Sequence, residues 1–169
     1  MTNSRMHRPF WQQAAMLLFF IIVCFAAAGV GAIGSMNAPQ FYGQLVQPVW
    51  APPTWLFGPV WTLLYAAMAF AAWLVWRKGP SAAVTIALVV FFLQLALNAL
   101  WSWMFFAWQL GAGAFIEILM LWLLIALCIV LFRRIQPLSA YLLWPYLAWV
   151  SFASALNFAL WQANPGILG

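Results

Sequence analysis

The stretch Ala82–Phe106, AAVTIALVVFFLQLALNALWSWMFF, decides the fold of this chain. It contains no charged side chain, and a helix of about 20 apolar residues is long enough to cross a bilayer. Strands of membrane barrels are only about 10 residues long and alternate apolar with polar positions. A continuous apolar run of this length therefore predicts a membrane-spanning helix.

The composition extends this prediction to the whole chain. Its 169 residues are 69% hydrophobic and 4% charged, whereas a soluble domain carries about 25% charged residues. Similar apolar runs lie on either side of the first, and the predicted spans cover residues 12–34, 56–76, 82–106, 112–132 and 138–161. We therefore expect an all-α integral membrane protein, in which residues 1–169 form a single bundle of five transmembrane helices.

The positions of the basic residues predict the orientation of the bundle. They are Arg5, Arg8, Arg77, Lys78, Arg133 and Arg134. With five spans, all of them fall on one side of the membrane, as the positive-inside rule requires. The N-terminus is then inside, and the C-terminus and the loop 35–55 are outside. Because these cations are spread along the chain and form no basic face, nucleic acid is not an expected partner.

The loop before the second span is rich in proline and tryptophan. Residues 47–61 read QPVWAPPTWLFGPVW. Proline fixes φ and removes a backbone donor, so the first half of this stretch cannot be the interior of a helix. A stiff segment loses little entropy when a ligand binds beneath it. We expect Trp50 and Trp55 at the interface or in a cover, and Trp61 inside the second span, facing a cavity.

The third span carries a polar stripe, Gln94, Asn98 and Ser102, spaced so that a helix places all three on one face. Unpaired amides are costly in hydrocarbon, so this face should meet protein or a cavity. Hydrogen bonding between helices is one interpretation. The other is that Asn98 lines a ligand site.

Aromatic and small residues share faces on the neighbouring spans. Ala153 lies one turn after Trp149 in the fifth span, and Tyr65 lies one turn after Trp61 in the second. We expect Trp61, Trp101 and Trp149 inside the bundle, because they share faces with small or polar residues. Aromatic walls of this kind suit a large, flat, apolar ligand.

The chain is poor in reactive side chains. Its one acid, Glu117, is interpreted either as an interfacial residue near a helix N-terminus or as a functional intramembrane carboxylate. The cysteines, Cys24 and Cys128, are expected to be buried free thiols. The sequence has no cluster of metal ligands and no nucleophile paired with a base, so we expect no metal and no required cofactor.

Three blocks resemble the translocator protein family, also called the tryptophan-rich sensory protein or peripheral-type benzodiazepine receptor family. They are WAPPTWLFGPVWTLLYAAM (50–68), QLALNALWSWMFF (94–106) and PYLAWVSFASALNFALW (145–161). The resemblance runs in order from about Phe41 to Trp161. It implies a five-helix membrane bundle, often dimeric, so that a homodimer is expected within the membrane lipid.

The resemblance also implies the ligands: tetrapyrroles such as protoporphyrin IX or a haem-like molecule, sterols in animal members, and synthetic isoquinoline and benzodiazepine compounds. Their site lies in the bundle, under the loop after the first span. Trp61 and Trp149 resemble the pair implicated in light-dependent porphyrin breakdown. The candidate ligand-binding residues are Trp50, Pro52, Trp61, Tyr65, Asn98, Trp101, Ser102, Glu117, Trp149, Ala153 and Leu156.

One departure from the family concerns sterols. Animal members end the fifth span with Leu or Val, then Tyr, then Lys or Arg, whereas this chain has Leu156, Phe158 and Gln162. The sterol pattern is therefore absent, and sterol binding through it is not expected. This departure favours a bacterial member over an animal one. The expected location is the bacterial cell membrane rather than an outer membrane or a mitochondrial outer membrane.

The sequence thus predicts a membrane receptor or sensor for porphyrin-like tetrapyrroles. An enzymatic alternative is light- and oxygen-dependent porphyrin degradation with Trp61 and Trp149 as redox-active side chains. Transport of a tetrapyrrole or sterol, and a purely structural partner role, are further alternatives.

Overall fold

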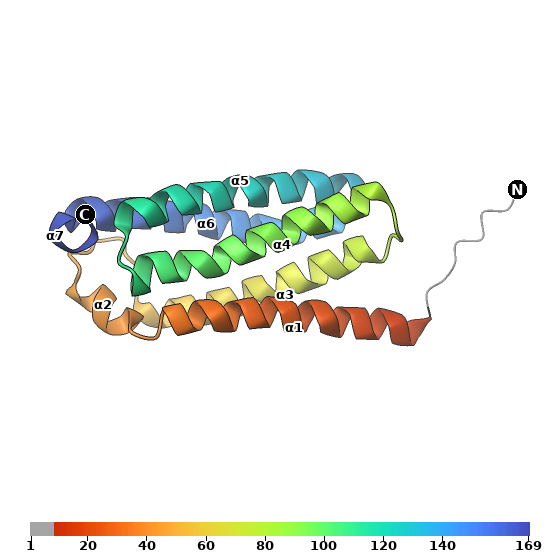
Figure 1. Cartoon of the computed structure of the whole chain (residues 1–169), viewed down its shortest axis with the longest axis horizontal. Helices are drawn as coiled ribbons and strands as arrows, with labels where there is room; N and C mark the ends of the chain where they lie inside the picture. Colours follow the sequence, from red (N-terminus) through yellow and green to blue (C-terminus); the bar gives the residue numbers. More distant parts are fainter. Residues whose placement is uncertain (1–8) are drawn as a thin grey trace, which may run out of the picture.

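The computed structural model describes residues 9–169 and shows a bundle of long, nearly parallel and antiparallel helices (Figure 1). Five of its helices are long and apolar enough to cross a membrane. Their bounds are α1 Phe10–Gly34, α3 Phe57–Trp76, α4 Ala82–Ser102, α5 Gly111–Ile135 and α6 Pro137–Ala163. The predicted all-α fold class with five membrane helices is therefore confirmed.

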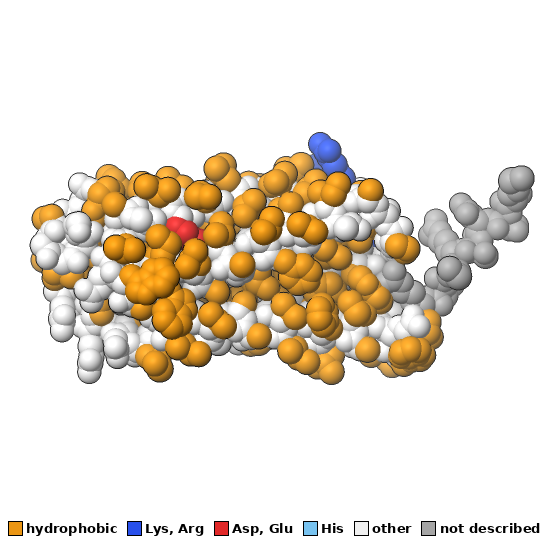
Figure 2. Space-filling model, in the orientation of Figure 1, with side chains coloured by type: hydrophobic (Ala, Val, Ile, Leu, Met, Phe, Trp, Pro, Cys, Tyr) orange, Lys and Arg blue, Asp and Glu red, His pale blue; other side chains and the backbone are white. Residues whose placement is uncertain are grey.

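The helices close into a ring around a common core. α1 packs against α3 and α4, α3 packs against α6, and α5 lies between α6 and α4. Many large apolar side chains are exposed along the helices, and they predominate among the coloured side chains on the face shown in Figure 2. An exposed apolar surface of this extent suits contact with lipid rather than with water.

The segment between α1 and α3, predicted as a loop over residues 35–55, contains helical structure. α2 spans Ala38–Gln44, and a short 3-10 helix, η1, spans Thr54–Leu56 immediately before α3. Pro39 lies in the first turn of α2, where its missing N–H is not needed. The proline-rich residues 45–53 between them are not helical, as expected. We call residues 35–56 the cover segment, because they lie across one end of the bundle (Figure 1).

The end of the bundle opposite the cover segment carries basic residues. Arg77 and Lys78 follow α3, and Arg133 and Arg134 lie in the last turn of α5, which extends past the predicted end of its span. Arg5, Arg8 and His7 lie outside the described residues. We call this the basic end. That it faces the inside stays a prediction.

The half of the bundle nearest the basic end is closely packed. Phe20, Phe91 and Phe132 are almost fully buried there, and the Phe91 ring lies 6.4 Å from that of Phe20 and 6.1 Å from that of Phe132. Cys24 and Cys128 are buried and free, as predicted. Alanines at α3 and α4 positions with no exposed surface allow the helices to approach closely here.

α4 ends in an irregular turn at the cover end. A π-helical segment, η2, spans Trp103–Ala107, and the N–H of Trp108 donates to the carbonyl of Trp103. Single π turns often occur at functional sites, because the extra residue re-aims the side chains around it. Here the turn buries Phe105 and directs Phe106 toward the space beneath the cover segment.

Candidate ligand-binding site

A cavity of about 360 Å³ lies in the cover half of the bundle. Residues of α1, α3, α4 and α6 form its walls, and α2 and η1 of the cover segment contribute further lining residues. Its volume falls within the range of roughly 300–1,000 Å³ typical of small-molecule sites. The cavity therefore occupies the position expected for the site, inside the bundle and beneath the segment after the first span.

Aromatic rings make up much of the wall. The Trp61 ring lies 5.6 Å from that of Tyr65 and 6.1 Å from that of Tyr146. Trp149 packs edge-on against Phe57 at 5.9 Å. Trp61 and Trp149 both line the same cavity. These rings offer faces and edges with which a flat aromatic ligand can stack.

A buried hydrogen-bond network crosses three helices at the level of Asn98. The Tyr65 hydroxyl donates to Asn98 Oδ1, and Asn98 Nδ2 donates to the Tyr146 hydroxyl at 2.9 Å. The Tyr146 hydroxyl in turn donates to Gln94 Oε1 at 2.9 Å. Each polar group thereby has a partner where no water is available.

The polar stripe on the third span takes part both in hydrogen bonding between helices and in the lining of the cavity. Gln94 is 1% exposed and lies below the cavity, where it serves helix–helix bonding. Asn98 belongs to the network and also lines the cavity, as does Ser102 one turn further on. The stripe therefore holds the bundle together at one end and contributes polar atoms to the cavity at the other.

Two glycines of α1 fit tightly against the neighbouring segment, and one of them, Gly31, lines the cavity. A Cβ on Gly31 would lie 3.3 Å from Ser102 Oγ, and one on Gly34 would lie 2.9 Å from the Trp103 ring. Gly29, by contrast, has no atom within 4 Å of such a Cβ. Gly31 therefore allows α1 to approach α4 closely, and Gly34 allows it to approach η2.

The Trp101 side chain is fixed by α6. Its Nε1 donates to Asn157 Oδ1 at 3.1 Å, and Asn157 Nδ2 donates to the Gly111 carbonyl at 3.2 Å. The Trp101 ring also stacks on Phe105, with centroids 5.3 Å apart and an interplanar angle of 11°. Asn157 therefore joins α4, α5 and α6 and holds an aromatic wall residue in one orientation.

The cover segment is attached to the far end of the chain. Asn164, between α6 and α7 (Pro165–Leu168), accepts from the Val46 N–H at 2.8 Å and donates to the Val46 carbonyl at 3.0 Å. Asn164 is 6% exposed. A paired contact of this kind fixes the segment more firmly than a single bond would, and it positions α2 over the cavity.

The structure brings seven of the predicted site residues to the cavity. They are Trp61, Tyr65, Asn98, Trp101, Ser102, Trp149 and Ala153. The other predicted residues, Trp50, Pro52, Glu117 and Leu156, do not line it.

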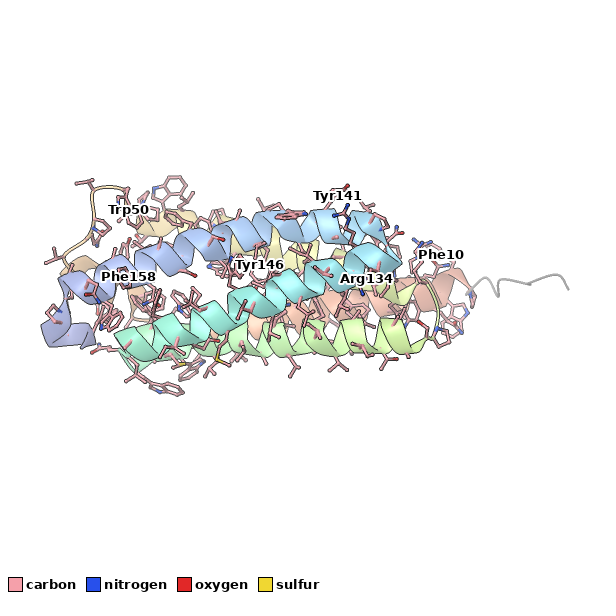
Figure 3. The ribbon with its side chains drawn as sticks, turned by 90° about the horizontal axis from the view of Figure 1, so that it is seen from above. Phe10, Trp50, Arg134, Tyr141, Tyr146 and Phe158 are labelled. Atoms are coloured by element: carbon pink, nitrogen blue, oxygen red, sulfur yellow. The ribbon has the colours of Figure 1, made fainter. Side chains whose placement is uncertain are left out.

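These remaining residues have other contacts. Trp50 packs edge-on against Phe152 at 5.8 Å and stays half-exposed near the cover end, as Figure 3 shows. Pro52 accepts a long hydrogen bond of 3.5 Å from the Tyr42 hydroxyl. Leu156 belongs to a separate apolar cluster with Phe41. Trp50, Pro52 and Leu156 therefore support the cover segment or the helices around it rather than the cavity surface.

Glu117 lies on α5 and is 5% exposed, with a small red edge visible in the apolar face of Figure 2. Neither carboxylate oxygen has a hydrogen-bond partner within residues 9–169. A solvated interfacial residue would expose its carboxylate, so this burial favours the intramembrane interpretation. It is not, however, a wall of the cavity.

Sequence reasoning missed several residues of the site. Tyr146 was not singled out, although it lies about one turn before Trp149, on the side of α6 that faces the network. Asn164 follows the last apolar run, so no periodicity pointed to it. On α1, residues 25–35 read FAAAGVGAIGS, and small residues spread this evenly do not indicate which of them line the cavity.

The described residues contain no group of histidines, cysteines and acids that could hold a metal ion. The cavity lining contains no Lys, Arg, Asp or Glu. Its chemistry is therefore that of an apolar, aromatic pocket with a few hydroxyl and amide groups.

These features define a class: an integral membrane protein in which a helix bundle encloses an aromatic cavity beneath a folded cover. Residues 6–162 match the family model of the TspO/MBR family. The chain belongs to this family, and the resemblance found in the sequence is confirmed.

Named relatives cover most of the chain. It is 41% identical to the tryptophan-rich protein TspO of Chlorobaculum tepidum, over 91% of this chain and 99% of that protein. It is 37% identical to the human translocator protein, over 77% of this chain and 78% of that protein. The protein CrtK of Rhodobacter capsulatus is 36% identical, over 89% of this chain and 95% of its own length.

Proposed function

We propose that this membrane receptor or sensor binds a porphyrin-like tetrapyrrole in the cavity beneath the cover segment. The observation that carries the proposal is the placement of Trp61 and Trp149 in the wall of one cavity, with Asn98 in the same lining. A tetrapyrrole is large, flat and apolar over most of its area. It therefore matches the rings that surround this space.

The lining chemistry also sets the orientation of the ligand. No cation lines the cavity, and burying an unpaired carboxylate is very costly. The macrocycle of protoporphyrin IX would enter with its propionates directed outward, toward the polar surface. Isoquinoline and benzodiazepine compounds, which carry no such groups, would fit the same walls.

Membership of the family and the departure at Leu156, Phe158 and Gln162 support the remaining proposals. We infer a bacterial cell-membrane protein that acts as a homodimer, requires no cofactor, and does not bind sterol through the fifth span. Nucleic acid is not proposed as a partner.

Titration of protoporphyrin IX against tryptophan fluorescence tests the site. The double variant Trp61→Phe/Trp149→Phe should lower the affinity at least several-fold, because it removes two indole faces while keeping aromatic volume. Trp55→Phe is the matched control, since Trp55 is 70% exposed and does not line the cavity. Equal affinity in the double variant and the control would contradict the proposal.

A second candidate function is light- and oxygen-dependent porphyrin degradation. It is favoured by one observation: both Trp61 and Trp149 line the cavity, and Trp149 Nε1 has no hydrogen-bond partner within the part of the chain that the structure describes. Loss of porphyrin absorbance under illumination in air, absent in the dark and in the Phe variants, would support it. Binding without product formation that depends on the protein would leave the receptor alone.

A further inference from the structure

A second hollow lies on the outside of the bundle, between α5 and α6 near the basic end. Its volume is about 600 Å³, and its lining shares no residue with the cavity beneath the cover segment. We propose that this groove binds an anionic phospholipid, with the lipid phosphate on Arg133 and one acyl chain along the floor between the two helices.

The groove has the length of one lipid leaflet. It runs along α5 from Arg133 to Trp122, which is about 16 Å at 1.5 Å per residue. Half of a hydrocarbon core roughly 30 Å thick has about the same depth. A lipid whose headgroup lies at Arg133 would therefore reach Trp122 with its chain.

Small residues make the groove concave. Ala126 on α5 and Ala140 on α6 face it, and Leu147 is buried further along. Larger side chains would fill the space between the helices and leave a flat surface. At the end of the groove away from Arg133, a hydrogen bond of 2.8 Å from Trp122 Nε1 to Ser151 Oγ joins α5 to α6. An acyl chain fits such a narrow apolar channel better than a rigid planar ligand does.

The charge at the mouth of the groove is not neutralised by the protein. The only acid of the chain, Glu117, lies on the same helix, about 24 Å away from Arg133 at 1.5 Å per residue. The Arg133 side chain has no ion pair or hydrogen bond within residues 9–169. Arg77, by comparison, already lies over the Trp73 ring at 4.6 Å. Arg133 therefore presents a cation to whatever occupies the groove.

Two side chains beside Arg133 are typical of the level of lipid headgroups. Tyr141 is 64% exposed and Trp144 is 53% exposed, and both line the groove. Amphipathic rings of this kind concentrate at membrane–water interfaces. Figure 3 shows Tyr141 and Arg134 toward the same end of the bundle, opposite Trp50 and Phe158. Arg133 and Tyr141 thus lie near one depth, where a phosphate group would lie, and Trp144 lies about one turn deeper along α6.

The chain offers a matched pair of arginines for the test. Arg134 has the same charge and the next position on α5, but it does not line the groove. Native mass spectrometry of the full-length protein can count retained phosphatidylglycerol and phosphatidylcholine with identical acyl chains. Arg133→Gln should weaken phosphatidylglycerol binding roughly fivefold, the size expected for one arginine at an anionic surface. Arg134→Gln should weaken it clearly less, and phosphatidylcholine binding should not change in either variant.

A second variant tests the acyl chain. Ala126→Leu fills the floor and should lower retention of both lipids, with helical content by circular dichroism unchanged. Equal losses in Arg133→Gln and Arg134→Gln would overturn the proposal, because surface charge alone would then explain binding. Unchanged lipid retention in Ala126→Leu would also overturn it. So would loss of a dimer in Arg133→Gln without loss of lipid, which would assign the groove to a second copy of the chain.

Discussion

The same helices pack densely in the half of the bundle near the basic end and enclose a cavity in the half near the cover segment. Near the basic end, Ala71, Ala72 and Ala87 have no exposed surface, and the helices close around phenylalanine rings. Near the cover end, the same α3 and α4 enclose a cavity of about 360 Å³. Mean apolarity is high throughout, so hydrophobicity does not distinguish the halves. The difference lies in how large and small residues are distributed around the ring.

In the cover half, bulky aromatic residues prevent the helices from collapsing onto one another. Trp61 and Trp149 form walls, and their positions are fixed by contacts with Tyr65 and Phe57. The hydrogen-bond network at Asn98 separates this half from the dense half below. A cavity inside a membrane bundle therefore requires fixed walls and a polar floor, and not only an absence of side chains.

The largest expected effect comes from adding the same volume to each half. Ala87→Leu should destabilise the protein by about 1–3 kcal/mol, because a fully packed site cannot accept three more carbons without strain. Ala153→Leu should change stability much less, since its side chain can extend into the cavity, but it should strongly weaken protoporphyrin binding. Thermal unfolding in detergent and fluorescence titration measure the two effects.

The comparison between the halves would be broken by equal stability losses in these two leucine variants. Ligand binding should follow the opposite order, with Ala87→Leu retaining affinity at temperatures where it is folded. Unchanged protoporphyrin affinity in Ala153→Leu would mean that the ligand binds away from Ala153.

A somewhat smaller effect is expected at the boundary between the halves. Asn98→Ala removes the acceptor for Tyr65 and the donor to Tyr146. Interhelical hydrogen bonds in membranes contribute roughly 0.6 kcal/mol on average and up to about 1.7 kcal/mol. The loss should therefore be about 1–2 kcal/mol in unfolding experiments. Ser102→Ala, which also removes a polar group from the cavity lining, is the control and should cost clearly less.

The fold could be predicted because its signals are local or cumulative. An apolar run such as 82–106 specifies a span by length alone, and the spacing of Gln94 and Asn98 places both on one face whatever surrounds them. Trp61 and Trp149 were assigned to the interior for the same reason. Each of these inferences needs only the geometry of one helix.

The rest of the site depends on contacts between distant segments. The Asn164 side chain is hydrogen-bonded to the backbone of Val46, 118 positions away in the chain. No pattern within either segment predicts this contact. Trp50 was a reasonable candidate by type, yet it packs on Phe152 at the outside. The helix α2 does have a local signal that the sequence analysis did not use, since Pro39 suits a first helical turn.

The third prediction concerns the attachment of the cover segment. Asn164→Ala removes both bonds to the Val46 backbone and should cost about 1 kcal/mol. Because the contact fixes the cover rather than the bundle, the loss should appear mainly as faster hydrogen exchange in residues 38–46 and faster ligand exchange. Asn37→Ala, just before α2, is a control that leaves the Val46 contacts intact. Unchanged exchange rates in Asn164→Ala would show that the segment is held by its apolar contacts instead.

The smallest effect is expected at Tyr42, and a second tyrosine of the same cavity makes it informative. Tyr42 lines the cavity from the cover side, and its hydroxyl reaches the Pro52 carbonyl only at 3.5 Å. A hydrogen bond of that length contributes little, so Tyr42→Phe should change stability by less than about 0.5 kcal/mol. Tyr65→Phe should cost more, because it leaves Asn98 Oδ1 without its donor in a buried network. A larger loss at Tyr42 than at Tyr65 would mean that the cover, and not the floor, holds the cavity in shape.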